Sequence, residues 1–226
     1  MVPERPQPFA PHVVILGVPV HAVTFESMLD TIATWIERGD RCYQICTASP
    51  EFVMIAQDDA QFRHVLRQAD LCVADGVGLL MAARFLGRPL PERVTGSDGL
   101  PLIAERAART GWKLFLLGAA PGVAEQAADA LRRRYPGVQI VGTYAGSPDP
   151  SEDDDLVARV NASGADILFV AYGAPRQDLW IARNAPRLTA RVAIGVGGAV
   201  DFAAGKVPRA PRWMQRLGLE WLFRLI

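Results

Sequence analysis

The chain alternates short apolar runs with segments of helical spacing along most of its length, and this alternation restricts its fold more than any other feature. Each apolar run ends at glycine, proline or a small polar residue, and the segment after it repeats apolar residues at intervals of three and four. Strands that alternate with helices form a parallel sheet covered on both faces. The sequence therefore predicts an α/β fold, a single Rossmann-like domain with a mostly parallel sheet.

The expected elements follow from this pattern. Strands are expected at residues 12–18, 43–46, 71–74, 112–117, 138–141, 167–171 and 191–196. Helices are expected at residues 25–38, 50–68 (with Ser49 as cap and Pro50 in the first turn), 79–85, 100–109, 122–134, 151–163 and from 177 onward. Residues 87–99 are expected to form a loop, because they are polar and broken by glycine and proline. We divide the chain into a flexible leader (1–11), an α/β domain (12–205) and a C-terminal segment (206–226).

Composition excludes several classes of protein. The 24 basic and 24 acidic residues give a formal net charge of zero, which argues against nucleic acid as a partner. Cys42, Cys46 and Cys72 lie in or beside apolar runs, so we expect buried free thiols and a reducing cytoplasm. No apolar run is long enough to span a membrane.

Asp75 is the candidate catalytic residue, because it ends the apolar run 71–74 and is followed by Gly76 and Gly78. In an open parallel sheet, ligands bind at the carboxyl ends of the strands. The alternative is that Asp75 only caps the helix that follows, which is a common position for aspartate.

Three further strand ends lead through small residues into helices, at 118–120, 173–175 and 197–199. Small residues let the backbone approach a ligand closely, and a helix N-terminus favours phosphate. The alternative is that short connections need small residues in any case. The dinucleotide fingerprint G-x-G-x-x-G and the phosphate-loop motif are both missing, so an NAD-dependent oxidoreductase is disfavoured.

The residue pattern favours no metal site. No D-x-D pair stands near a strand end, and we interpret the acidic run 153–155 as a solvated helix start. The histidines His12, His21 and His64 are scattered along the chain, and His64 is expected at the surface. If the chain is an enzyme, its base is expected to be a carboxylate.

Residues 206–226 are basic and amphipathic, with interleaved arginines, tryptophans and leucines. Such a stretch binds an anionic membrane surface or packs on a partner, and the alternative is an ordinary terminal helix docked on the sheet. The chain stops within an apolar run at Ile226, so a truncated tail is expected.

Several motifs occur in an order that resembles the WecG/TagA/CpsF glycosyltransferases, glycosyltransferase family twenty-six. They span residues 47–51, 74–76, 93–98, 117–118, 173–177, 195–202, 205, 209–213 and 218–225. The resemblance implies a metal-independent, inverting, membrane-associated enzyme without a cofactor. It would transfer N-acetylmannosamine, its uronic acid or a related hexose from a UDP-sugar to a polyprenyl-diphosphate-linked acceptor, at the cytoplasmic face of the membrane, for bacterial surface polysaccharides.

The resemblance also assigns residues. Asp75 matches the proposed general base, Thr47 matches the threonine of a T-x-N motif, and these two residues form the expected catalytic set. Ser49 stands where the family has asparagine. Its hydroxyl is shorter and offers one hydrogen-bond donor where an amide offers two, which points to a different donor sugar. Together with the small-residue strand ends, the resemblance gives the expected substrate-binding set: Ser49, Arg93, Gly118, Ala119, Ala120, Tyr172, Gly173, Gln177, Gly197, Gly198 and Asp201.

Without a metal, the charge on the departing UDP has to be met by helix N-termini, backbone amides and arginines. Family members can self-associate, so a homo-oligomer is among the expected partners. They also continue into an arginine-bearing tail, so this chain is expected to be inactive or weakly active as it stands. The rival hypothesis is a nucleotide-binding regulatory or interaction module, with Asp75 as a cap.

Overall fold

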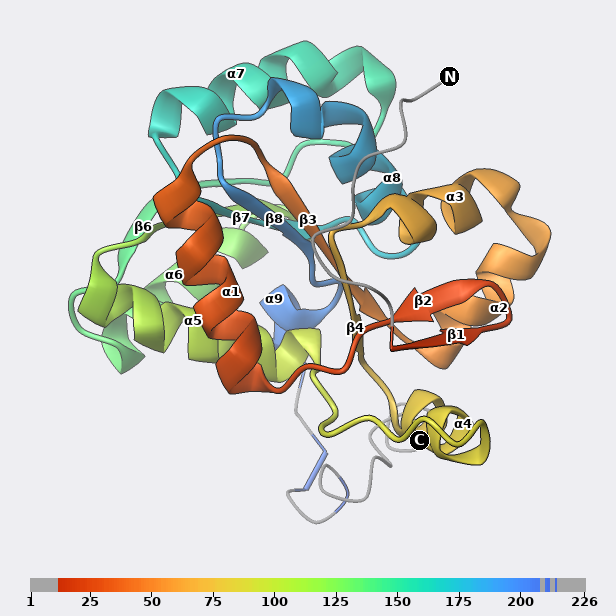
Figure 1. Ribbon diagram of the computed structural model, residues 1–226. Helices are drawn as coiled ribbons and strands as arrows, with labels where there is room; N and C mark the ends of the chain where they lie inside the picture. The colour runs from red at the N-terminus through yellow and green to blue at the C-terminus, as the bar shows by residue number, and fades with distance from the viewer. Residues whose placement is uncertain (1–11, 208–209, 212–213, 215–226) are drawn as a thin grey trace.

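A parallel sheet forms the centre of the computed structural model, which describes residues 12–207, 210–211 and 214 (Figure 1). Its six strands pair in parallel throughout, as the alternation predicts. Across the sheet they run β4 (Leu71–Ala74), β3 (Tyr43–Ala48), β8 (Val192–Gly195), β7 (Ile167–Ala171), β5 (Lys113–Gly118) and β6 (Gln139–Tyr144). The α/β fold class is confirmed.

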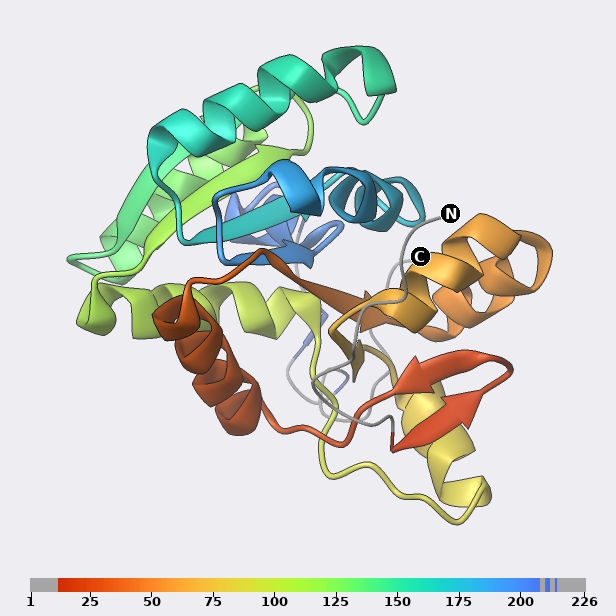
Figure 2. The same ribbon diagram turned by 45° about the horizontal axis from the view of Figure 1, so that its top comes forward.

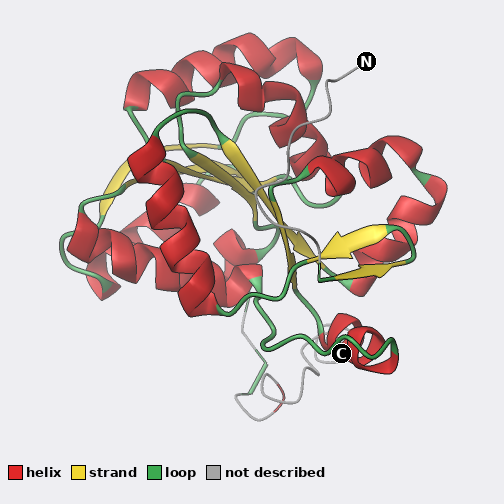
Figure 3. Cartoon of the chain, in the orientation of Figure 1, coloured by secondary structure: helices red, strands yellow, loops and turns green. Residues whose placement is uncertain are grey.

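Helices cover both faces of this sheet, as Figures 2 and 3 show. One face packs against α1 (Phe25–Arg38), α5 (Gly96–Thr110), α6 (Val123–Arg134) and α9 (Ala199–Ala203). The other face packs against α2 (Pro50–Asp58), α3 (Ala60–Gln68), α7 (Asp153–Ser163) and α8 (Arg176–Asn184). Every residue of β3, β4, β7 and β8 is consequently buried, which explains why β4, β7 and β8 read as continuous apolar runs; β3 also contains the buried polar residues Gln44 and Thr47.

The first predicted strand, 12–18, is wrong in its extent and in its expected place in the parallel sheet. The chain instead forms an antiparallel hairpin of β1 (Val13–Ile15) and β2 (Val18–Val20), separate from the main sheet. The intervening Leu16 and Gly17 have φ of 46° and 85°, which reverses the chain tightly. After β2, the backbone N–H of His21 donates to Cys72 of β4 and its ring nitrogen accepts from the Cys72 N–H, so the hairpin covers the sheet edge.

Two predicted helix boundaries are also wrong. The helix expected over 50–68 is divided at Asp59, which ends α2 and whose carboxylate accepts from the Phe62 N–H to begin α3. The helix expected from residue 100 begins at Gly96, within the predicted loop. There Thr95 is the N-cap: its hydroxyl donates to the Asp98 carboxylate and accepts from the Asp98 N–H.

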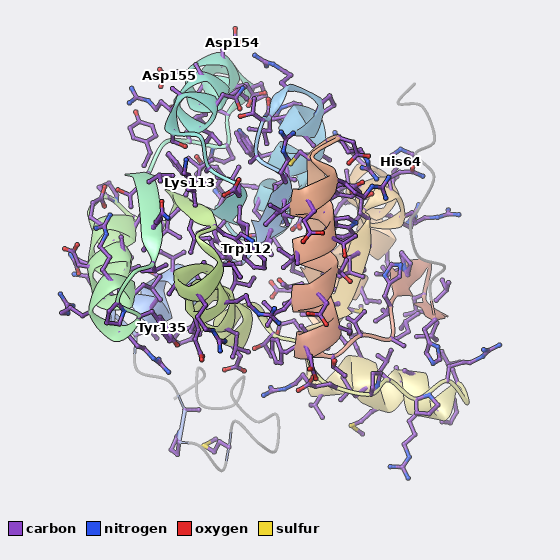
Figure 4. All side chains as sticks on the ribbon, turned by 60° about the vertical axis from the view of Figure 1, so that its left-hand side comes forward. His64, Trp112, Lys113, Tyr135, Asp154 and Asp155 are labelled. Carbon is purple, nitrogen blue, oxygen red and sulfur yellow. The ribbon has the colours of Figure 1, made fainter. Side chains whose placement is uncertain are left out.

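The acidic run 153–155 is only partly solvated. The helix expected from residue 151 begins two residues later: Asp149 caps the short 3₁₀ turn at Pro150–Glu152, and α7 then begins at Asp153. Asp153 is buried and its carboxylate lies 2.5 Å from the Arg183 guanidinium, which corrects our interpretation of that residue. Asp154 and Asp155 are exposed as expected, on the outer side of α7 (Figure 4).

Other expectations are confirmed within the described residues. Cys42, Cys46 and Cys72 are free and buried. His64 is exposed on α3, and Figure 4 shows it at the surface. No described helix combines the length and the apolar composition that a bilayer crossing requires.

Candidate functional site

The candidate site lies where β4, β3 and β8 end side by side. These strands are neighbours in the sheet and run parallel, so their carboxyl ends meet at one edge. Ala48 is paired with Ala74, and the Asp75 N–H donates to the Ala48 carbonyl 2.6 Å away. The end of β3 and the candidate base that follows β4 are therefore held together.

The Asp75 carboxylate is half-buried and accepts a hydrogen bond from the Gly96 N–H, with 2.9 Å between Oδ2 and nitrogen. The alternative that Asp75 caps its own helix, α4 (Val77–Phe85), is wrong. Gly76 is the N-cap there, without a side-chain hydrogen bond. The Asp75 carboxylate thus accepts a hydrogen bond from the first turn of α5, which is distant in sequence, while it remains at the sheet edge.

Thr47 connects this edge to β8. Its side chain is buried and its hydroxyl donates to the Gly195 carbonyl, 2.8 Å away. A methyl group added to Gly96 would lie 3.4 Å from the Val196 carbonyl oxygen and 3.6 Å from the Thr47 hydroxyl oxygen. The start of α5 therefore packs directly against the ends of β3 and β8, and a glycine at residue 96 keeps that space open.

Gln177 joins α8 to the same region. Its side chain is 2% exposed, and its Oε1 accepts from the Gly197 N–H at 2.9 Å. Gly197 has φ of 49°, and Gly198 is the N-cap of α9, whose first turn contains the half-buried Asp201. Gln177 consequently fixes the turn after β8, so at least part of its role is to shape the site.

Asp178, which we did not predict, is the most deeply buried carboxylate near the site. Neither of its oxygens makes a hydrogen bond of ordinary geometry within the described residues. Burial raises its pKa to about 7, although the adjoining Cys46 and Gln177 side chains act in the opposite direction. A methyl group on Gly195 would lie 2.8 Å from an Asp178 oxygen. The Asp178 carboxyl group therefore packs against Gly195 of β8, the same residue whose carbonyl accepts from the Thr47 hydroxyl.

The turn 118–120 follows β5, two strands away from β8 beyond β7. Gly118 has φ of 98°, and an added methyl would lie 2.8 Å from the carbonyl carbon of Ala171. Ala119 has φ of 64° and its N–H donates to the Ala171 carbonyl. Ala120 is exposed and its carbonyl accepts from the Val123 N–H at the start of α6. The pairing of β5 with β7 thus explains the glycine at residue 118 without a ligand.

Two other members of the predicted set have defined places near the candidate base. The Ser49 hydroxyl oxygen accepts from the Phe52 N–H and caps α2, as the sequence predicts. Arg93 is half-buried, beside Val94, whose N–H donates to Ala74 at the end of β4. These two residues lie beside the sheet edge that contains Thr47 and Asp75, which we call the Thr47–Asp75 edge.

Tyr172 is placed differently. Its side chain is buried in the core on the α7–α8 face, with its ring 6.3 Å from that of Trp180. Burial raises the pKa of its hydroxyl, and a methyl on Gly146 would lie 3.0 Å from its oxygen. Gly173 follows with φ of 75° and its carbonyl accepts from the Gln177 N–H. The tyrosine side chain therefore contributes to the core, while Gly173 shapes the start of α8.

Comparison with known proteins adds to this geometry. The model of the glycosyl transferase WecG/TagA/CpsF family matches residues 13–226. An N-acetylglucosaminyldiphosphoundecaprenol N-acetyl-beta-D-mannosaminyltransferase of Bacillus spizizenii is 32% identical over 203 residues, which cover 90% of this chain and 77% of that protein. A protein of the same name from Staphylococcus aureus is 34% identical over 213 residues, covering 94% and 83%.

The family match includes every element that forms the Thr47–Asp75 edge, and it extends over nearly the whole chain. It favours the transferase interpretation over both the interaction module and the NAD-dependent oxidoreductase. The chain therefore belongs to the WecG/TagA/CpsF family of glycosyl transferases.

Proposed function

We propose that this enzyme moves N-acetylmannosamine, or a closely related sugar, from a UDP-sugar to a polyprenyl-diphosphate-linked acceptor, with Asp75 as the general base. The observation that supports the role of Asp75 is its position: a half-buried carboxylate at the carboxyl edge of β4, oriented by the Gly96 N–H. A carboxylate held in this way keeps one geometry, and its partial exposure leaves it open to an incoming hydroxyl.

The proposed step is an inverting displacement. The acceptor hydroxyl gives its proton to the Asp75 carboxylate, its oxygen forms a bond to the anomeric carbon of the donor sugar, and the bond from that carbon to UDP breaks on the opposite face. We propose that no metal or other cofactor takes part. Backbone N–H groups at the strand ends and the arginine at residue 93 would then meet the charge on the departing diphosphate.

The names of the relatives support the choice of substrates. Both relatives are named for transfer of N-acetyl-beta-D-mannosamine to N-acetylglucosaminyldiphosphoundecaprenol. Because this chain matches them over most of its length, we infer the same acceptor class and a bacterial surface polysaccharide as the final product. Ser49 occupies its position as a helix cap, so a related hexose remains among the donors to be tested.

A lipid-linked acceptor implies a peripheral enzyme at the cytoplasmic face of the membrane. We infer that the basic amphipathic segment 206–226 contributes to this attachment and that a homo-oligomer can form. Most of that segment, residues 208–209, 212–213 and 215–226, lies outside the described residues, so this inference rests on its sequence.

A transfer assay tests the proposal. The full chain is incubated with UDP-N-acetylmannosamine, or a panel of other UDP-sugars, and an N-acetylglucosamine diphosphate linked to a short prenyl chain. Asp75→Asn is expected to lower transfer by about 10³-fold, because the amide cannot accept the proton, while UDP binding measured by calorimetry stays within about twofold. Asp129→Asn, an equal change of charge on the exposed side of α6, is expected to leave both unchanged.

Three outcomes contradict the proposal. Transfer by Asp75→Asn at the rate of the unchanged enzyme removes Asp75 from the role of base. Binding of UDP and UDP-sugar without any turnover by the unchanged chain, in the presence of the lipid-linked acceptor, favours a binding module instead. Stimulation by a divalent cation, abolished by a chelator, contradicts the metal-independent step.

A further inference from the structure

Helix α4 presents apolar side chains to solvent on the face opposite its packed side. Leu79 and Ala83 are buried against the hairpin and β4, as in an ordinary amphipathic helix. On the outer side, however, Met81 is 67% exposed and Phe85 is 90% exposed, and Leu86 just after the helix is 52% exposed. Monomeric soluble proteins seldom expose large apolar side chains in contiguous groups without a partner.

The charges beside these residues have one sign. Residues 76–91 contain no aspartate or glutamate, and their charged residues are Arg84 and Arg88, which are both exposed. Neither guanidinium makes an ion pair with a described residue. We call Met81, Arg84, Phe85, Leu86 and Arg88 the α4 face.

The position of the α4 face connects it to the candidate site. Helix α4 lies at the periphery of the molecule, below the hairpin in Figure 1, and begins directly after Asp75 and Gly76. Its nine residues span about 14 Å at 1.5 Å per residue. Along the helix axis, Met81, Arg84 and Phe85 therefore lie within about 14 Å of the turn that contains Asp75.

We propose that the α4 face binds the surface of an anionic phospholipid bilayer. Met81, Phe85 and Leu86 enter the boundary between headgroups and acyl chains, and Arg84 and Arg88 contact lipid phosphates. Exposed apolar side chains flanked by arginines and free of acids have the chemistry that such an interface binds. This proposal deepens the proposed function, on which it rests, because it names the surface that brings Asp75 to a membrane-linked acceptor.

Sedimentation with vesicles tests the α4 face in the full chain. Phosphatidylglycerol vesicles are compared with phosphatidylcholine vesicles, at low and high salt. The double variant Met81→Gln/Phe85→Ser is expected to lower partition into phosphatidylglycerol vesicles about tenfold, and Arg84→Gln/Arg88→Gln is expected to lower it similarly at low salt only. Binding that remains is assigned to segment 206–226.

Matched variants control for general effects. Met54→Gln changes a methionine that is 62% exposed on α2, and is expected to leave partition unchanged. Arg109→Gln/Arg133→Gln removes two exposed arginines from α5 and α6, and is expected to have less effect than the α4 pair. Unchanged partition of Met81→Gln/Phe85→Ser overturns the proposal.

Further measurements distinguish membrane binding from two other partners of the α4 face, and the failure of this proposal from the failure of the proposed function. If the apolar double variant changes the molar mass in solution by light scattering but not vesicle binding, the face contacts a second copy and the proposal is overturned. If it lowers the melting temperature by several degrees without affecting vesicle binding, another part of this chain covers the face, and the proposal is overturned as well. The apolar double variant is expected to keep its transfer activity toward a short-chain acceptor in solution. Absence of transfer by the unchanged enzyme would contradict the proposed function without affecting the interpretation of the vesicle experiment.

Discussion

The carboxylate of Asp75 accepts the N–H of Gly96, 2.9 Å away, and so joins the end of β4 to the first turn of α5. The first N–H groups of a helix have no partner within the helix, and a carboxylate near them is favoured by the helix dipole. The Asp75 side chain therefore provides a partner for one N–H group of the first turn of α5 and also lies at the sheet edge. This arrangement fixes the orientation of the proposed base before substrate binds.

Thr47 yields the first prediction. Thr47→Val replaces the hydroxyl that donates to the Gly195 carbonyl with a methyl group of similar size. Because the buried carbonyl then loses its side-chain donor, the free energy of unfolding is expected to fall by about 1–2 kcal/mol. Transfer is expected to fall about tenfold, because the end of β8 is then no longer held by a hydrogen bond to residue 47 beside the proposed base. Urea denaturation and the transfer assay measure the two effects.

Thr47→Ser is the control for this prediction. Serine keeps the hydroxyl and loses only the methyl group, so transfer is expected to return to within about twofold of the unchanged enzyme. Thr47→Val with full stability and full transfer would show that the hydrogen bond to Gly195 contributes to neither.

Sequence periodicity predicted the parallel sheet because β4, β7 and β8 are buried on both faces and so read as apolar runs between helical segments. It also predicted the placement of Asp75, since a carboxylate after such a run must reach the carboxyl edge. It failed for the hairpin of β1 and β2, where three residues on each side of a two-residue turn resemble one longer strand. The reversal lies at Leu16 and Gly17, whose φ values are positive.

The partners of the site residues were beyond sequence reasoning. Gly96 lies in a stretch of glycine, proline and charge that favours a loop, although the Thr95-to-Asp98 spacing is a capping signal. Asp178 stands in a helix, where aspartate usually faces solvent, and only the packing of α8 on β3 and β8 buries it. Tyr172 follows a strand end, yet its side chain turns into the core.

Close packing of β5 on β7 yields the second prediction. Gly118 and Gly122 both have positive φ, 98° and 82°, so alanine is strained at either residue. A methyl on Gly118 also meets the backbone of Ala171 at 2.8 Å, whereas the nearest atom to a methyl on Gly122 is a flexible side-chain nitrogen at 3.9 Å. Gly122→Ala is expected to cost about 1 kcal/mol and Gly118→Ala about 3 kcal/mol or more.

Calorimetry measures this difference as a melting temperature. At this chain length, about 1 kcal/mol corresponds to roughly 2–4 °C, so Gly118→Ala is expected to melt several degrees below Gly122→Ala. Equal melting temperatures would show that the backbone of Ala171 moves aside and that the small residues of this turn are not required by packing.

The buried carboxyl group of Asp178 yields the third prediction, for which the direction of the pH effect follows from proton linkage. Its pKa is about 7 in the folded protein, above the value of about 3.9 expected in the unfolded chain. Between these values the folded state binds more protons than the unfolded state. Stability from this group is therefore greatest at low pH and is lost as the pH rises toward 7, by at most about 1.4 kcal/mol per pH unit.

Asp178→Asn removes the titration while keeping the shape of the side chain. We expect the stability of the variant relative to that of the unchanged enzyme to increase from pH 5 to pH 7, by up to about 1.4 kcal/mol per pH unit. The difference should level off between pH 7 and pH 8, where the unchanged enzyme holds a buried charge. Urea denaturation at pH 5, 6, 7 and 8 gives the two curves, and Asp155→Asn, at an exposed residue of α7, controls for the loss of one carboxylate. Parallel curves for Asp178→Asn as well would mean that the Asp178 pKa is the same in both states, because a group without a linkage difference cannot change the slope.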